Sequence, residues 1–66
     1  MNLIVNGDAY RHEGNGTLAE LFRELQAEPA RTAVLLNGEV APRGRWPEVR
    51  LAEGDRVELV TFAGGG

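Results

Sequence analysis

The first apolar run of the chain, Leu3-Ile4-Val5, ends at the turn-forming pair Asn6-Gly7. Asn-Gly favours a two-residue type I′ turn, because both central positions of that turn need a positive φ. The pattern predicts a β-hairpin whose return strand covers residues 8–12 and carries Tyr10 and His12 on one face. His12 is the only histidine of a chain without cysteine, so we interpret it as a surface strand residue rather than a ligand or base.

A helical period follows from Thr17. Thr17 and Glu20 have the spacing of a capping box, in which each side chain accepts a hydrogen bond from the backbone N–H of the other residue. Pro29 disfavours helical geometry at Glu28, so the helix is expected to end there. One face of this helix is apolar, with residues at i, i+3, i+4 and i+7: Leu18, Leu21, Phe22 and Leu25. The other face is expected to contact water: Glu20, Arg23, Glu24 and Gln26.

The second half of the chain contains further strand signals. Residues 33–36 form an uninterrupted apolar run, typical of a strand that is covered on both faces, and a second Asn-Gly turn follows at Asn37-Gly38. Residues 40–42 are expected to be extended. Residues 43–49 predict a loop or a single helical turn, in which Trp46 closes one end of a small core.

Residues 56–62 give the longest strand signal, and their alternation divides them between two faces. Val57, Leu59 and Thr61 share one face, whereas Glu58, Val60 and Phe62 share the other. If Val57 and Leu59 face the helix, Val60 and Phe62 form a small exposed apolar patch, which with Glu58 would be a surface for docking a partner. The alternative is that both apolar residues lie in the core or pair across strands.

One amphipathic helix and a mixed sheet of four or five strands predict an α+β fold. The first and last strands could be parallel neighbours, as in a β-grasp. We therefore expect one β-grasp domain over residues 1–62, followed by a flexible glycine tail over residues 63–66. A chain of 66 residues buries only about 60% of its unfolded surface, so little room remains for an enclosed catalytic pocket.

The composition narrows the classes of partner. The formal net charge of -3 argues against nucleic acid, and no apolar stretch is long enough to span a bilayer. The N-terminus lacks the features of a signal peptide, so a cytoplasmic protein is expected. All seven basic residues are arginine. Two interpretations stay open: codon bias, or the exclusion of lysine amines that would attack an activated C-terminus.

The chain ends on Gly64-Gly65-Gly66, directly after the last predicted strand. Glycines have no side chain to bury, and they lose much backbone entropy when they become ordered. Three of them extend about 10 Å, enough to carry a terminal carboxylate into a narrow site on another protein. The alternative is a frayed terminus without function.

The chain resembles a known family, the ThiS family of ubiquitin-like sulfur carriers of thiamine biosynthesis. The resemblance covers nearly the whole chain, and it is strongest where several short motifs combine with the glycine tail. These motifs are Asn6-Gly7, the leucines of the helix, the stretch from Leu36 to Arg43 with Trp46 after it, and the stretch from Leu51 to Val60 that contains Gly54-Asp55.

The resemblance implies a reaction cycle in which the chain itself catalyses nothing and binds no cofactor. An E1-like adenylyltransferase would use ATP and magnesium to adenylate the Gly66 carboxylate. A sulfur-donor relay would then replace AMP and leave a thiocarboxylate on Gly66, with Gly64 and Gly65 threading the partner's site. Thiazole synthase would take the sulfur for the thiazole ring of thiamine. The free carrier is expected to be a monomer.

Three other functions remain open from the sequence. A related sulfur carrier, such as the small subunit of molybdopterin synthase, would share the fold and the tail. A plain β-grasp interaction module would have an inert tail. A protein modifier would join its C-terminus to amines in isopeptide bonds.

Overall fold

The computed structural model describes residues 1–62, and five strands in this part of the chain form one mixed sheet. Their order across the sheet is β2-β1-β5-β3-β4. The strands are β1 (Asn2–Val5), β2 (Asp8–Arg11), β3 (Thr32–Leu36), β4 (Glu39–Ala41) and β5 (Arg56–Thr61). The first and last strands, β1 and β5, run parallel at the centre, whereas the other neighbouring pairs are antiparallel.

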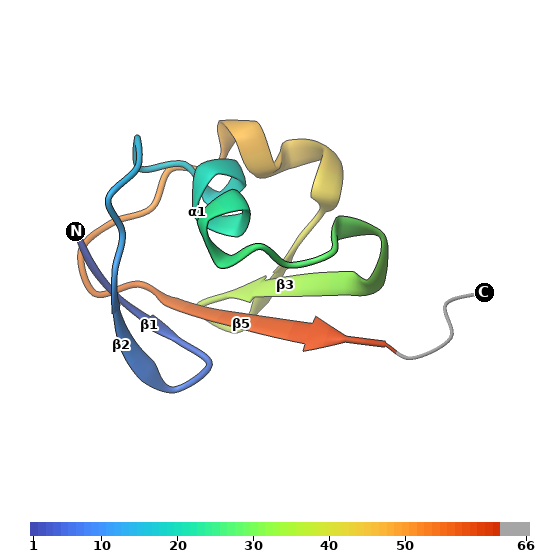
Figure 1. Cartoon of the computed structure of the whole chain (residues 1–66), viewed down its shortest axis with the longest axis horizontal. Coiled ribbons are helices and arrows are strands. Elements are labelled where there is room, and N and C mark those ends of the chain that lie inside the picture. Colours follow the sequence, from blue (N-terminus) through green and yellow to red (C-terminus); the bar gives the residue numbers. More distant parts are fainter. Residues whose placement is uncertain (63–66) are drawn as a thin grey trace.

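The helix α1 (Leu18–Leu25) lies on one side of this sheet, together with the two short 3-10 helices η1 (Pro29–Arg31) and η2 (Arg43–Glu48) (Figure 1). The opposite side of the sheet carries no helix among the described residues. This is the β-grasp arrangement, so the predicted α+β fold is confirmed, with five strands. No helix within residues 1–62 is long and apolar enough to cross a membrane.

Both predicted Asn-Gly turns are present and join the two antiparallel hairpins. Asn6 and Gly7 have φ of 52° and 86°, and Asn37 and Gly38 have φ of 51° and 87°. Positive φ at both central positions is the requirement of the type I′ turn. These turns fix the registers β1–β2 and β3–β4, and with them the faces on which the strand side chains lie.

The N-terminus of α1 is capped, but only half of the predicted capping box forms. The Thr17 hydroxyl accepts a hydrogen bond from the Glu20 N–H at 3.2 Å. The Thr17 N–H donates instead to Asn15 Oδ1 at 3.0 Å, so the reciprocal bond from Glu20 is replaced by a neighbouring side chain.

The C-terminus of α1 differs from the prediction. The helix ends at Leu25, and Gln26 takes the left-handed conformation with φ of 57°, its N–H donating to the Arg23 carbonyl. A left-handed residue reverses the chain and satisfies a terminal carbonyl, so the helix stops before the proline exerts its effect. Pro29 instead begins η1, which Glu28 caps.

The core lies between α1 and the covered face of the sheet. Trp46 packs on Phe22, with ring centroids 4.4 Å apart, and its indole N–H donates to the Ala41 carbonyl at 2.8 Å. The predicted role of Trp46 in closing the core is thereby confirmed. The buried apolar residues are Leu3, Val5, Leu18, Leu21, Phe22, Val34, Ala41, Trp46, Leu51 and Val57.

Candidate functional site

The sequence places the candidate reactive group on the glycine tail. Gly64, Gly65 and Gly66 lie outside the described residues, so their roles stay predictions. The strand that leads to them, β5, is paired with β3 from Val57 to Thr61. The next N–H, that of Phe62, donates to the Arg31 carbonyl at 2.9 Å. The sheet therefore holds the backbone in place as far as Phe62.

The open face of the sheet, opposite α1, carries an exposed apolar patch that we define as Val40, Val60 and Phe62. Their exposed fractions are 69%, 46% and 49%. Val60 lies opposite Ala33 in the β5–β3 register, and Val40 lies opposite Leu35 in the β4–β3 register. The patch residues therefore come from β4 and the end of β5 and share one face, with β3 between them. Glu58 is also exposed on this face and lies opposite Leu35, at the border of the patch.

The alternation predicted for residues 56–62 agrees with the structure. Val57 is fully buried on the covered face, and Leu59 packs against the core. The sequence did not indicate Val40 as a patch residue. The available signal was its position after the Asn37-Gly38 turn and directly before Ala41, because neighbouring residues of a strand point to opposite faces. Whether the patch docks a partner stays a prediction at this point.

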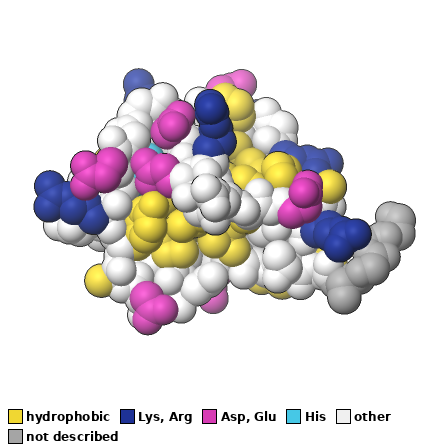
Figure 2. Space-filling view, in the orientation of Figure 1, with side chains coloured by type: hydrophobic (Ala, Val, Ile, Leu, Met, Phe, Trp, Pro, Cys, Tyr) yellow, Lys and Arg dark blue, Asp and Glu magenta, His cyan; other side chains and the backbone are white. Residues whose placement is uncertain are grey.

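A hollow of about 260 Å³ adjoins the patch at the end of β5. Phe62 and Val40 line it together with Pro42 and Arg43. The Arg43 guanidinium donates to the Pro29 carbonyl at 2.9 Å and so connects η2 with η1. Figure 2 shows dark-blue arginine side chains at this end of the molecule. The border of the patch therefore carries charges of both signs, with the Arg43 guanidinium at the hollow and the exposed Glu58 carboxylate on the same face of the sheet.

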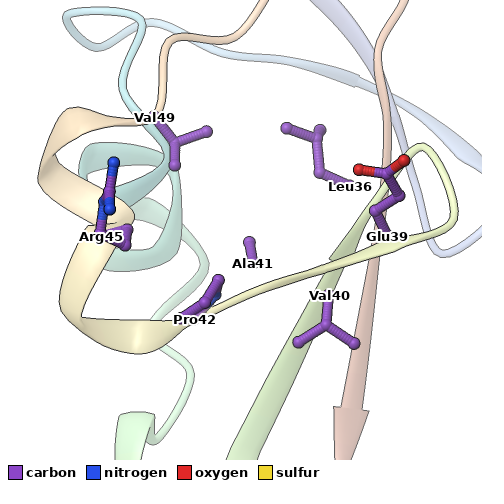
Figure 3. A pocket seen from close by; sticks show the side chains of 7 residues that line it. All are labelled: Leu36, Glu39, Val40, Ala41, Pro42, Arg45 and Val49. Atoms are coloured by element: carbon purple, nitrogen blue, oxygen red, sulfur yellow. The ribbon is translucent and has the colours of Figure 1, made fainter.

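A second hollow, of about 330 Å³, lies between β4 and η2 (Figure 3). Leu36, Ala41 and Val49 provide apolar lining, and Glu39 and Arg45 lie on opposite sides of it. Within residues 1–62, no group of three His, Asp or Glu side chains could hold a metal ion. The lining of this hollow is therefore mainly apolar, with one carboxylate and one guanidinium at its sides.

His12 is buried, contrary to the prediction of a surface residue. Only 3% of it is exposed, and its Nε2 accepts a hydrogen bond from the Gly16 N–H at 3.0 Å. The Gly14 N–H lies 3.4 Å from Nδ1, the other nitrogen of the ring. Nδ1 is 3.0 Å from Glu24 Oε1, and Tyr10 donates its hydroxyl proton to the same oxygen at 2.9 Å.

Glu24 is therefore a member of a polar cluster with Tyr10 and His12, and its predicted place on the wet face of the helix is wrong. Burial alone would raise the pKa of Glu24, but the hydrogen bonds from His12 and Tyr10 together lower it. The same bond to Glu24 raises the pKa of Tyr10. The cluster connects β2 and the following loop to α1, which is a structural role.

Comparison with known proteins places the whole chain in one group. A family model described as the ThiS family matches residues 3–66. The crystal structure of the thiamine biosynthesis protein ThiS from Geobacter metallireducens superposes with a TM-score of 0.83 at 38% identity, covering 100% of both chains. The sulfur carrier protein ThiS of Bacillus subtilis is 35% identical over 65 residues, which are 97% of this chain and 98% of that protein.

Two longer proteins also match, both named thiazole synthase. The one from Paramagnetospirillum magneticum is 33% identical, and the one from Magnetococcus marinus is 38% identical, each over 66 residues. The chain spans only 20% of the length of either thiazole synthase. The match to the family model and the likeness to a whole small carrier agree with the β-grasp fold, and the chain belongs to the ThiS family.

Proposed function

We propose that this protein is a sulfur carrier for thiamine biosynthesis and that the carboxylate of Gly66 holds the sulfur. The observation that carries the proposal is the match to the ThiS family, which extends from residue 3 to the last glycine. The fold supports it, because β5 is held by the sheet up to Phe62 and leads directly to the tail.

The chemistry requires an activated carboxylate, because a free carboxylate is a poor electrophile. An E1-like adenylyltransferase would join the Gly66 carboxylate to the AMP portion of ATP and release pyrophosphate, with magnesium as the ion of that enzyme. Sulfide-level sulfur from the donor would then attack the carboxyl carbon, the C–O bond to AMP would break, and loss of the sulfur's proton would leave a thiocarboxylate. A donor that attacks as a persulfide would first form an acyl disulfide, whose S–S bond a thiol would have to reduce. ATP is thus a substrate of the partner enzyme, and magnesium is that enzyme's metal ion. The carrier itself needs no bound cofactor.

The proposed acceptor of the sulfur is thiazole synthase. Two proteins of that name contain a stretch similar to this whole chain within one longer polypeptide, which supports contact between a carrier domain and the synthase. We propose that the patch of Val40, Val60 and Phe62, with Glu58 at its border, docks such partners. Exposed apolar surface next to the reactive tail is the support for this assignment.

The remaining expectations follow from the same cycle. The free carrier would be a monomer in the cytoplasm, where ATP and the sulfur relay are available, without nucleic acid or membrane as a partner.

The proposal is tested by the intact mass of the protein after incubation with its activating enzyme, ATP, magnesium and a sulfur donor. We expect one terminal oxygen to be replaced by sulfur. The matched control is a variant with one bulky residue added after Gly66, which keeps the fold and should not be converted. An unchanged mass beside an enzyme that converts another ThiS protein would contradict the proposal, as would conversion of the extended variant without trimming.

A further inference from the structure

The two edges of β5 are paired to different extents. On the β3 side the register is continuous from Val57 opposite Leu36 to Thr61 opposite Thr32. On the β1 side only Arg56 and Val57 have partners in the register. Figure 1 shows the cause, since the β1–β2 hairpin turns away while β5 continues beside β3. The last part of β5 is therefore an edge of the sheet, although β5 is its central strand.

Asn6 ends the pairing on the β1 side. Its N–H donates to the Val57 carbonyl at 2.9 Å, and its side-chain oxygen accepts from the Leu59 N–H at 2.8 Å. Alternate residues of a strand direct their N–H and C=O groups to the same side, so Leu59 and Thr61 direct theirs away from β3. Among residues 1–62, no group bonds to the Leu59 carbonyl or to the Thr61 N–H.

This edge lacks the usual protection against pairing with another chain. Natural sheets protect edges with charged side chains, proline or bulges. Residues 59–62 read Leu-Val-Thr-Phe, without charge or proline, and the register with β3 has no bulge. Two of the four, Val60 and Phe62, also belong to the exposed patch. The free backbone groups, the patch and the start of the tail therefore lie together.

We propose that an extended segment of thiazole synthase adds as a strand to the free edge of β5 at residues 59–62. The proposal rests on the proposed function, which supplies this partner. Backbone bonds to the Leu59 carbonyl and the Thr61 N–H provide affinity, and an apolar side chain of the added strand contacts Val60 and Phe62 and provides specificity. Such pairing fixes the direction in which the chain leaves β5 and so aims the tail at the partner's site.

The edge is short, which favours this partner over a second copy of the chain. Pairing between two copies would use the same few residues twice and would place both tails beside the same short ladder. When the synthase supplies the added strand, the tail stays available to enter the synthase site that receives the sulfur.

The test removes the Thr61 N–H and measures the affinity of the full chain for thiazole synthase. In Thr61→Pro the N–H is lost, but the ladder to β3 does not use that N–H, and proline is tolerated at a strand edge. The control Thr61→Val keeps the N–H. We expect Thr61→Pro to bind the synthase about tenfold more weakly than the native chain, because one well-placed hydrogen bond is lost. We expect Thr61→Val to bind it like the native chain.

A second variant covers the case in which the proline disturbs the strand. A synthetic chain with an ester in place of the Val60–Thr61 amide loses the same N–H without the ring. If the folded ester chain binds as tightly as the native chain, the strand-addition proposal is wrong, while thiocarboxylate formation on the native chain leaves the proposed function intact. Native protein that neither acquires sulfur nor binds the synthase overturns both. A dimer of the free chain that depends on the Thr61 N–H would show that the occupant is a second copy.

Discussion

At the scale of single residues, polar side chains connect segments that are distant in the sequence. His12 and Tyr10 converge on one oxygen of Glu24, and Asn6 caps the Leu59 N–H of the central strand. These bonds satisfy polar groups that would otherwise be costly to bury. A lone histidine in a sequence gives no sign of such partners, because they come from another element.

The Glu24 cluster predicts a pH dependence of stability. The pKa of Glu24 is lowered in the folded protein, so its ionised form stabilises the fold above the ordinary carboxyl pKa. That contribution is lost as the pH falls through the lowered value. We expect Glu24→Gln to reduce the free energy of unfolding at neutral pH by about 1 kcal/mol, and the difference from the native chain to shrink in acid.

Urea unfolding at a series of pH values between neutral and acid would measure this difference. Glu48→Gln is the matched control, because Glu48 has an exposed side chain and pairs only with exposed Arg45. We expect that control to change stability little at any pH. A difference between Glu24→Gln and the native chain that stays constant with pH would contradict the assigned role of Glu24.

At the scale of elements, the features that the sequence predicted correctly are those set by local chemistry. The Asn-Gly pairs form turns with positive φ, and the apolar stripe of the helix is buried. The alternating residues of 56–62 lie on two different faces of the sheet. The predicted end of α1, at Glu28, lies beyond the observed end at Leu25. Any residue can take the left-handed conformation at some cost, and no property of Gln26 in the sequence indicates that it does so. The place of Val40 in the patch depended on the register of β4 with β3.

Gln26 gives a prediction at this scale. It holds φ of 57° with an exposed side chain, a conformation in which residues other than glycine are strained. We expect Gln26→Gly to raise the free energy of unfolding by about 0.5–1 kcal/mol, since the relief of strain exceeds the added entropy of the unfolded chain.

Thermal or urea unfolding of Gln26→Gly and of Gln26→Ala would separate the effect of φ from that of the side chain. Alanine keeps the strain, so it should resemble the native residue in stability. If glycine lowers the stability, Gln26 either carries no strain or contributes through its side chain.

At the scale of the whole molecule, one face of the sheet carries no helix among residues 1–62 (Figure 1). The helix covers one side of the sheet (Figure 1), and the apolar patch lies on the other side. Phe62 of this patch directly precedes the tail in the sequence. The pattern of apolar residues predicted this α+β architecture, the resemblance to the ThiS family agreed with it, and both the fold and the family are confirmed. The free edge of β5 could not be predicted, because it depends on where the hairpin turns away.

The patch gives a prediction for partner binding. Replacing Val60 and Phe62 together by serine removes exposed apolar area without opening the core. We expect the variant to fold and to bind its activating enzyme and thiazole synthase at least tenfold more weakly, because central apolar contacts dominate interface energies. Arg23→Ser on the outer face of α1, with a side chain 80% exposed, is the control. Equal binding by both variants would exclude the patch as the docking surface.

The central claim is that the sulfur is carried by the carboxyl group of Gly66, and fragmentation mass spectrometry of the loaded protein tests it most directly. We predict that every fragment containing Gly66 carries the oxygen-to-sulfur mass change and that fragments ending before Gly66 do not. Sulfur on a fragment that lacks Gly66, or a loaded protein that ends at another residue, would contradict the account.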